Sequence, residues 1–510
     1  MRKESKISCL IWLISAVVVL CQCIPLPAAE GAENASGSAA VSTADEVNTL
    51  KEQLEEQRKR IEKLSSALAQ QQELLDRVLK ASQVQADPQK ATDLELVKGE
   101  LHAVADSAAQ ANQRLTKVET DTAAYNKSND SKLKQLGIFA FSGDVRARYE
   151  PFFQEGSPDR HRERIRLRFN MTARISDEFN GGFSLATGSL DDPVSTNQTF
   201  TNFFNRKNIG IDKAFITYKP KFAKPVKLDA GKFAFPWYRT AMTFDNDVNP
   251  EGFAQTLSFD VKSSSSPLKN ITLVGFELPV NEVSAGPDSF AIGGQIQTHF
   301  RLSSRARLSL YGAGVNMLRM DPLAVASAGR ITGVFVGSLP NSNTLKRNSE
   351  GKVVGYAYRF AYLDTIMKLD LDTNPRFPTT ILFNFVNNVR GPKERSGYWV
   401  EATFGRQKEA KDLQFAYSYI RIEKDAVISA FNESDLRSST NVLDHKIQAG
   451  YMFHGSVQGQ FTAWIGKLAN PLDNPELVPV GVRGACTGSD TSRCADPYLK
   501  RLQFDVIYKF

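Results

Sequence analysis

The stretch that decides the fold is residues 501–510, which read RLQFDVIYKF. Apolar side chains fill every second position from Leu502 to Phe510, and most of the positions between them are polar. Successive side chains of a β-strand point to opposite faces, so one face would meet lipid and the other a wet lumen. An aromatic residue at the end of such a strand is typical of the closing strand of an outer-membrane β-barrel. The stretch therefore predicts a transmembrane barrel.

The same alternation recurs over residues 138–510, in segments separated by Gly, Pro, Asn, Asp and Ser clusters. These segments predict an all-β transmembrane barrel of about 16 antiparallel strands, wide enough to enclose an aqueous channel. The last strand would close the sheet by pairing with the first, near Phe139 and Phe141. Residues 321–351 fit either one long loop or an additional strand pair. Lys213 interrupts the alternation around it, which we interpret as a β-bulge.

Composition and charge agree with a barrel without requiring one. Apolar residues make up 42% of the chain and its mean hydropathy is −0.31, too polar for a helical membrane protein. The 32 Phe and 14 Tyr suit the aromatic girdles of a barrel, although a β-rich soluble protein has a similar composition. The net charge of +7 is spread along the chain. Since a nucleic-acid-binding protein needs a concentrated basic patch, we expect no nucleic-acid partner.

The N-terminus predicts export. Residues 1–29 have a basic start, an apolar run over 7–20 and small residues near Ala28, which is the plan of a cleaved signal peptide. Cys21 and Cys23 would allow a lipid anchor instead, but small residues do not precede them. No later stretch has the 18 to 20 continuous apolar residues, roughly, that a spanning helix needs. The mature chain would therefore cross a membrane only as strands.

Between the leader and the barrel we expect a flexible linker and a coiled coil. Residues 30–44 are rich in Gly, Ala and Ser, and residues 45–135 carry apolar residues at heptad spacing, interrupted at Pro88. Such a seam must be buried against a partner helix. Association between chains, which would make an oligomer, is favoured over an antiparallel hairpin that turns at Pro88. We expect this coiled coil to lie in the periplasm.

Two cysteines, Cys486 and Cys494, remain after the leader, eight positions apart in a Gly- and Ser-rich segment. In an exported protein such a pair is expected to form a disulfide. No histidine lies near them, so a metal site is not expected.

The strand that contains RERIRLR, residues 162–168, is the most unusual one. Each arginine on the lipid side would cost roughly 2–4 kcal/mol at the bilayer midplane, so the arginines must face the lumen. Six arginines are predicted to line the pore: Arg146, Arg148, Arg164, Arg166, Arg168 and Arg174. A column of this kind would attract anions. The alternative is a wet wall on which Asp144, Glu150 and neighbouring carboxylates neutralise the arginines, and the sequence does not choose between the two.

Residues 237–253 are predicted to fold into the channel as a constriction loop. They combine aromatic residues with three carboxylates, Asp245, Asp247 and Glu251, and follow a predicted strand. Ordinary turn chemistry is the alternative. The spacing of Asp245, Asp247 and Asn249 is also a hint of calcium binding, but the Gly and the distal Glu of an EF-hand loop are missing.

Several of these segments together resemble the putative porin family of Gram-negative bacteria. The resemblance rests on FSGDVRARY at 141–149, RERIRLR at 162–168 and the D-x-D-x-N-P-E-G pattern at 245–252, and covers most of 138–510. The heptad region is also similar to that of phosphate-selective porins. The resemblance implies a homotrimeric channel for small hydrophilic solutes in the lipid of the outer membrane. It also implies insertion by the barrel assembly machinery, which reads an aromatic ending in such proteins.

We therefore expect a passive diffusion channel in the cell outer membrane rather than an enzyme. The chain lacks the Gly-x-Ser-x-Gly, Gly-x-x-x-x-Gly-Lys-Ser/Thr and His-Glu-x-x-His motifs, and its five histidines lack metal-ligand spacing. We expect neither catalytic residues nor a cofactor. The alternative is a structural tether, in which the coiled coil reaches toward the peptidoglycan and the barrel serves as an anchor.

Overall fold

The computed structural model describes residues 138–201, 203–328, 341–372 and 374–510, together with sixteen separate positions between 59 and 120. The chain divides into two compact units, Met1–Lys134 and Gln135–Phe510. In the first unit every described position is helical and exposed, and Arg77 pairs with Glu73 at 2.7 Å. The expected signal peptide (1–29) and linker (30–44) lie outside the described residues. So do the apolar seam positions of the expected coiled coil (45–135).

The second unit is a closed barrel of sixteen antiparallel strands, as the alternation predicts. A two-residue strand, β4 (Gln198–Thr199), pairs with β2 as an addition to the wall. The wall strands, in the order in which they pair, are β1 (Phe139–Phe153), β2 (Arg160–Arg174), β3 (Phe179–Thr187), β5 (Ile209–Tyr218), β6 (Val226–Lys232), β7 (Glu251–Asp260), β8 (Leu268–Asn281), β9 (Ser289–Arg301), β10 (Ala306–Leu318), β13 (Phe360–Leu371), β14 (Thr379–Asn388), β15 (Ser396–Gly405), β16 (Leu413–Ile422), β17 (Val442–His454), β18 (Val457–Leu468) and β19 (Leu499–Lys509).

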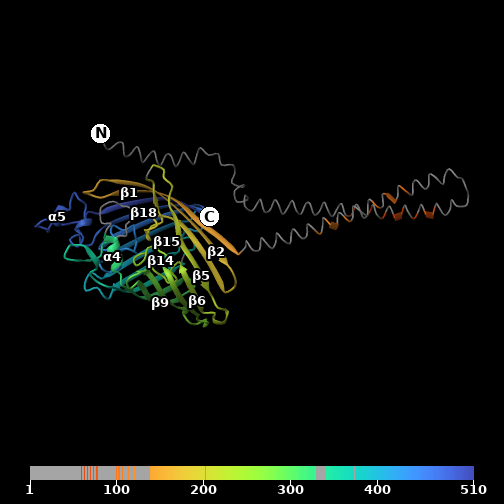
Figure 1. Ribbon diagram of the computed structural model, residues 1–510, viewed down its shortest axis with the longest axis horizontal. Coiled ribbons are helices and arrows are strands. Elements are labelled where there is room, and N and C mark those ends of the chain that lie inside the picture. The colour runs from red at the N-terminus through yellow and green to blue at the C-terminus, as the bar shows by residue number, and fades with distance from the viewer. Residues whose placement is uncertain are drawn as a thin grey trace. The chain divides into compact units, whose positions relative to one another are not determined.

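The barrel closes where the last strand meets the first. β19 runs antiparallel to β1 with Tyr508 opposite Val145, and Gly143 exchanges backbone hydrogen bonds of 2.8 and 3.2 Å with Phe510. In Figure 1 the orange strand β1 accordingly lies beside the blue C-terminal strands. The closing strand thus pairs with the first one a few residues beyond Phe139 and Phe141, and every wall strand has two neighbours.

Alternation along the strands separates an apolar exterior from a polar interior. On β19, Phe504 and Val506 are exposed whereas Gln503 and Asp505 are buried. Exposed apolar side chains recur on the outward face around the wall: Phe141, Ile216, Phe253, Phe259, Leu273, Ile296, Leu363, Phe383, Phe404, Phe415, Ile447, Phe504, Val506 and Tyr508. This is the surface that a lipid bilayer requires of a barrel. No helix among the described residues is long and apolar enough to span a membrane.

Long and short connections gather at opposite ends of the barrel. The 321–351 stretch, for which the sequence allowed a loop or a strand pair, contains helix α4 (Asp321–Ala328) and part of a small hairpin, β11 (Leu345–Arg347) and β12 (Val353–Tyr356). This hairpin forms its own sheet and adds nothing to the wall. Figure 1 shows α4 and α5 (Gly484–Thr487) toward the same end of the barrel. Both belong to long loops.

The main apolar cluster lies inside the barrel, between the wall and loops that fold into it. The loop between β6 and β7 (residues 233–250) contributes Trp237, Met242 and Phe244, and the loop between β16 and β17 (residues 423–441) contributes Val427 and others. They pack on inward-facing wall residues such as Phe276 of β8. The loops therefore fill part of a lumen that sixteen strands would otherwise leave open.

Candidate functional site: a cavity beside the infolded loop

The arginines of β1 and β2 face the lumen opposite carboxylates. The register pairs Asp144 with Arg168 and Glu150 with Arg162, and it places Arg146 opposite Arg166. Residues that lie directly opposite each other on paired antiparallel strands point to the same face of the sheet. Two adjacent strands therefore form a single inward surface of alternating acids and guanidinium groups.

Short ion pairs connect these groups. Asp144 accepts from Arg166 Nη2 at 2.6 Å through Oδ1 and from Arg168 Nε at 2.7 Å through Oδ2. On β19, Asp505 binds Arg148 through two hydrogen bonds of 2.7 and 2.9 Å. Charge-assisted pairs of this kind are the strong ones among protein hydrogen bonds.

Glu150 is the centre of the network. Its Oε2 accepts from Arg162 Nε at 2.7 Å, and its Oε1 accepts from Arg501 Nε at 2.6 Å and from Gln503 Nε2 at 2.9 Å. The carboxyl group is wholly buried. Three strands, β1, β2 and β19, thus meet at one carboxylate.

The β16–β17 loop covers this surface. Its Asp435 accepts from Arg501 Nη2 at 2.5 Å and from Gln503 Nε2 at 2.8 Å. Burial alone would raise the pKa of Asp435, but Arg501 and Arg148 hold it well below its usual range. Around Asp435 the arginines of β1, β2 and β19 therefore form a platform that is buried under the β16–β17 loop and paired with carboxylates.

The six predicted arginines differ in how far solvent reaches them. Four of them, Arg146, Arg148, Arg164 and Arg166, have side chains no more than 10% exposed. Arg174 lies near the end of β2, 71% exposed, and pairs with Asp177 at 2.9 Å. Arg168, 36% exposed, reaches the space beside the β6–β7 loop. Of the six arginines, Arg168 alone lines that space, and it does so while paired with Asp144 at 2.7 Å.

The β6–β7 loop leaves the wall between two paired glycines and crosses the lumen. Gly231 and Gly252 lie opposite each other with φ of +107° and +135°, a region that residues with a Cβ rarely adopt. At its tip, Tyr238 exchanges hydrogen bonds of 2.9 and 2.7 Å with Gln295 of β9. Beyond the tip, Thr240 bonds to Asn384 of β14. The loop is thus tied to distant parts of the wall.

Two of the three predicted constriction carboxylates belong to this loop. Asp245 is buried and accepts from the backbone N–H groups of Ser434 and Asp247, both at 2.9 Å. Burial, and then Glu433 and Asp247, raise the pKa of Asp245 well above its usual value. Asp247 Oδ2 accepts from the N–H and the hydroxyl of Thr196 at 2.9 Å each.

Glu251 requires a correction. It begins β7 on the outward face, 64% exposed, and pairs with Lys232 at 3.1 Å. Because side chains alternate along β7, Glu251 lies on the same face as the exposed Phe253 and on the opposite face from the buried Ala254. It therefore does not belong to a constriction inside the barrel.

A cavity of about 330 Å³ lies between the β6–β7 loop and the wall strands β2 and β5. Three cations, Arg168, Lys213 and Arg239, and two carboxylates, Asp212 and Asp247, contribute to its lining. Across it, Arg168 Nη1 lies 3.7 Å from Asp247 Oδ1. Positive and negative groups thus face each other beside the infolded loop.

A β-bulge in β5 brings two of these residues into the cavity. The register with β3 pairs Lys213 with Ser184 but Ile211 with Leu185, so Asp212 is the extra residue. A bulge changes the parity of a strand, so Asp212 and Lys213 both turn inward. The bulge agrees with our interpretation of Lys213, although it also turns Phe215 inward, against the apolar cluster.

The sequence did not identify the cavity residues Asp212 and Arg239 as site residues, nor the loop residue Asp435. Asp212 could have been found from the interrupted alternation, because a bulge places two successive residues on one face. Arg239 lies within the predicted loop but was not singled out. Asp435 follows a strand without any motif, and we find no signal that would have marked it.

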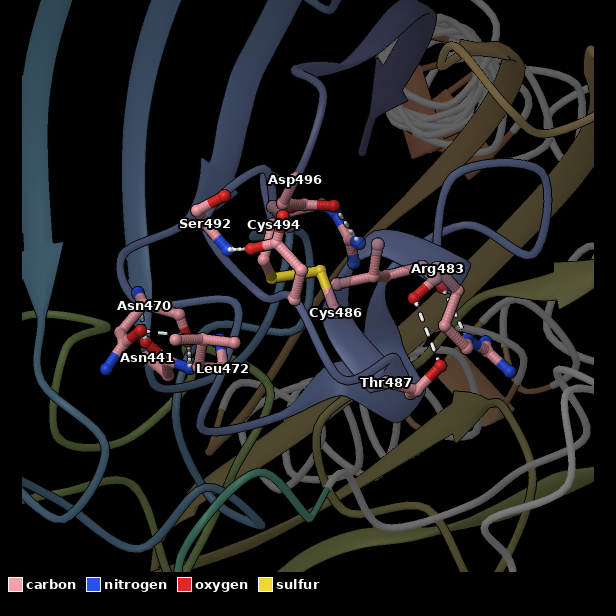
Figure 2. Close-up of a disulfide and its surroundings, with 12 residues drawn as sticks. Asn441, Asn470, Leu472, Arg483, Cys486, Thr487, Ser492, Cys494 and Asp496 are labelled. Carbon is pink, nitrogen blue, oxygen red and sulfur yellow. Dashed lines mark hydrogen bonds and ion pairs between the residues drawn. A yellow bond between two sulfur atoms is a disulfide. The ribbon is translucent and has the colours of Figure 1, made fainter.

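The disulfide lies apart from this cavity, in the loop between β18 and β19 (residues 469–498). Cys486 of α5 is bonded to Cys494, the predicted pair, with an S–S distance of 2.07 Å. Figure 2 shows the bond beside Asp496. That carboxylate accepts from the backbone N–H of Leu468 at 2.8 Å and from Arg437 at 2.9 Å. The closed segment is thereby linked to the end of β18. No cluster of three or more His, Cys, Asp or Glu side chains suited to a metal occurs in the described part of the chain.

Comparisons with known proteins identify a family for this chain. The sequence profile of the family described as "Putative porin" matches residues 47–314, more than half of the chain. No curated protein matches the sequence. Among solved structures, OmpF of Salmonella typhi in complex with daunomycin is 11% identical, with a TM-score of 0.42 over 73% of this chain and 97% of that one. OprB of Pseudomonas putida is 9% identical, with a TM-score of 0.43 over 76% and 97%. OmpT of Vibrio cholerae, in a trimer form, is 9% identical, with a TM-score of 0.40 over 73% and 99%.

Proposed function

Because this chain belongs to the putative porin family, we propose that it forms a water-filled channel in the outer membrane for passive diffusion of small hydrophilic solutes. The observation that carries the proposal is the cavity beside the β6–β7 loop, where an infolded loop and the barrel wall present opposite charges to each other. Charge and width at a narrowing are what a pore uses to select solutes. No chemical step is required, and the protein is not an enzyme.

We propose further that the channel favours anions. Three cations and two carboxylates contribute to the cavity, whereas the buried arginines behind Asp435 are paired within the protein and do not steer solutes. An excess of positive charge at a narrowing raises the local concentration of anions. Selectivity would thus come from Arg168, Lys213 and Arg239 in place of the predicted column.

The orientation follows from the lengths of the connections. Outer-membrane barrels have short periplasmic turns and longer extracellular loops. The end that carries α4 and α5 would therefore be extracellular, and residues 45–135 would lie in the periplasm as a coiled coil. Assembly into a homotrimer and insertion by the barrel assembly machinery complete the proposal, supported by the heptad pattern and the family resemblance.

Conductance in planar bilayers tests the channel. We expect discrete current steps from the full-length protein, and their absence would contradict the proposal. In a KCl gradient the reversal potential should indicate anion preference. A unit charge about 8 Å from an ion in water contributes roughly 0.5 kcal/mol, favourable for an anion and unfavourable for a cation, so Arg168→Gln should lower the anion-to-cation permeability ratio about fivefold. Arg174→Gln, on the same strand but 71% exposed at its end, is the matched control and should leave the ratio unchanged.

A second candidate function is a structural tether to the peptidoglycan. The heptad pattern favours it, as do the described helical positions between 59 and 120, all of which are exposed. Deletion of residues 45–135 should then abolish co-sedimentation of the protein with isolated peptidoglycan while the current steps persist. Unchanged sedimentation of the deletion variant would exclude the tether.

A further inference from the structure

The cavity beside the β6–β7 loop has more unused hydrogen-bond donors than acceptors. From this we infer that it is a binding site for small organic anions, namely carboxylates attached to an aromatic or other apolar carbon frame. The inference rests on the proposed channel function and names the class of solute that the channel would take. A volume of about 330 Å³ is at the lower end of the range for small-molecule sites, roughly 300–1,000 Å³.

The carboxylates of the cavity already have partners. Asp247 accepts two hydrogen bonds from Thr196 and lies 3.7 Å from Arg168. Asp212 accepts from the side chain of Asn249 at 2.9 Å and lies 3.7 Å from Lys213. Both carboxylates therefore use part of their acceptor capacity within the protein, and the two neighbouring cations oppose the negative charge of these groups.

The cations are less well satisfied. The nearest carboxylate to the ammonium group of Lys213 is that of Asp212, and its 3.7 Å exceeds ordinary hydrogen-bond length. Arg239 donates through Nη1 to the backbone oxygen of Phe244 at 2.6 Å and to Asn246 at 3.3 Å. Its Nε is buried without a partner, and no carboxylate within 4.0 Å is seen for it in the described part of the chain. The ammonium group of Lys213 and the part of the Arg239 guanidinium group that lines the cavity are the groups that a carboxylate would bind.

Arg239 stays charged in this position. Burial is the main cause that lowers its pKa, to about 10, and the nearby carboxylates of Asp245 and Asp247 oppose the shift. At neutral pH the guanidinium group is therefore a permanent cation. Lys213 approaches from the wall and Arg239 from the loop, so an anion between them would gain from both.

Aromatic rings supply the apolar part of the lining. Trp237 stacks on Phe276 with ring centroids 3.9 Å apart, and Tyr238 stacks on Tyr311 at 4.3 Å. Phe235 lies under the guanidinium group of Arg239 at 4.2 Å. Rings fixed in this way form a preorganised surface for a planar or apolar frame. Inorganic phosphate would use the cations but would leave this surface without a contact.

The experiment compares four probes on the full-length protein in detergent micelles, by thermal unfolding, and in planar bilayers, by block of the single-channel current. The probes are benzoate, acetate, inorganic phosphate and the neutral benzyl alcohol. We expect benzoate alone to raise the unfolding temperature at millimolar concentration and to block the current. Lys213→Gln should weaken both effects about tenfold, the change expected when one charge-assisted hydrogen bond worth roughly 1.4 kcal/mol is lost.

Two variants and a control make the result decisive. Arg239→Gln should weaken benzoate binding as Lys213→Gln does. Because Lys213 belongs to the barrel wall, Lys213→Gln tests the site even if the Arg239→Gln variant in the loop fails to fold. Arg174→Gln, on the exposed end of β2, should bind benzoate like the unaltered protein. Equal effects of acetate, phosphate and benzoate would overturn the assignment to organic anions. Unchanged benzoate binding in Lys213→Gln, or no binding by any probe, would overturn the site.

The two readouts separate this inference from the channel proposal. Thermal stabilisation by benzoate requires a binding site but no conduction. Stabilisation without current steps would leave the site standing and contradict the channel. Current steps without any stabilisation or block would support the channel and overturn the site.

Discussion

Replacement of Glu150 by glutamine should destabilise the barrel more than any other single carboxylate-to-amide change on β1. Glu150 is wholly buried and accepts hydrogen bonds from Arg162, Arg501 and Gln503, contributed by β2 and β19. Glutamine has nearly the same volume, so the substitution opens no cavity. What changes is the charge at the centre of a cluster of guanidinium groups.

The magnitude follows from the number of partners that lose a carboxylate. Loss of one member of a buried ion pair costs about 3–5 kcal/mol, because the other charge stays buried and unpaired. After the substitution Arg501 would still pair with Asp435 at 2.5 Å. Arg162 would lose its ion pair with Glu150, which is the carboxylate that it pairs with in the described part of the chain. We therefore expect a loss near the lower limit, about 3 kcal/mol, which is roughly a hundredfold change in the unfolding equilibrium constant.

Reversible unfolding by denaturant in lipid vesicles, followed by tryptophan fluorescence, measures this loss. Glu163→Gln is the matched control, because Glu163 lies next to Arg162 on β2 but is exposed. It should change the free energy of unfolding by no more than about 0.5 kcal/mol. A Glu150→Gln variant within about 1 kcal/mol of this control would refute the view that Glu150 holds the three strands together.

Three further changes test other parts of the molecule. Burial, and then Asp435, raise the pKa of Glu433 to about 7. The stability that this protonated group contributes is fully present below its ordinary pKa and is lost as the pH rises through about 7. The unfolding free energy of the unaltered protein should therefore decline between about pH 5 and 8, and Glu433→Gln should make that decline shallower. Joint replacement of Cys486 and Cys494 by serine should remove about 2.5 kcal/mol of loop-closure stabilisation and speed proteolysis of residues 469–498, with conductance unchanged. Gly143→Ala should lower the folded fraction in heat-modifiability gels, at a cost of about 1–3 kcal/mol, because the added methyl group would meet the backbone oxygen of Arg168 on β2 and the ring of Phe510 where the barrel closes.

Each of these changes has an outcome that would contradict it. A pH dependence that is identical in the Glu433→Gln variant would show that this carboxyl group is not protonated at the contact between the loops. Equal proteolysis rates with and without the disulfide would show that the segment is ordered by its other contacts. Gly312→Ala on β10 is the control for Gly143, since a methyl group there meets nothing within 4 Å. Equal folding of the two alanine variants would exclude a role for close approach in closure.

The barrel could be predicted from the sequence because period-two alternation is a property of the strand itself. Lipid outside and water inside impose opposite chemistry on the two faces, as Phe504 and Asp505 illustrate on β19. The same reasoning put Arg146 and Arg166 on the lumen side, where the register places them opposite each other. A local pattern and the high cost of charge in lipid were sufficient for these predictions.

Depth inside the lumen could not be predicted in this way. Alternation tells which face Arg148 occupies, but not that Asp435, 287 residues later, would cover it. Such a contact depends on the folding of a loop without a repeating pattern. The prediction for Glu251 was wrong for a related reason. Glu251 is the first residue of β7, and a shift of one residue in the start of a strand moves a side chain from the lumen face to the lipid face.

The buried arginines and the cavity beside the β6–β7 loop are therefore parts of one arrangement. Sixteen strands enclose a lumen that their own side chains cannot fill, so loops that enter it need partners for their polar groups. The platform of β1, β2 and β19 supplies such partners: Arg501 and Gln503 bind Asp435 of the β16–β17 loop. That loop in turn binds the β6–β7 loop through two hydrogen bonds. The backbone N–H of Ser434 donates to Asp245 Oδ2 at 2.9 Å, and the backbone N–H of Asp245 donates to the carbonyl oxygen of Phe431 at 2.7 Å. Arg148, which the sequence predicts as a pore-lining residue, thus helps to hold the β16–β17 loop, and this loop in turn contacts the β6–β7 loop beside the cavity of the proposed site.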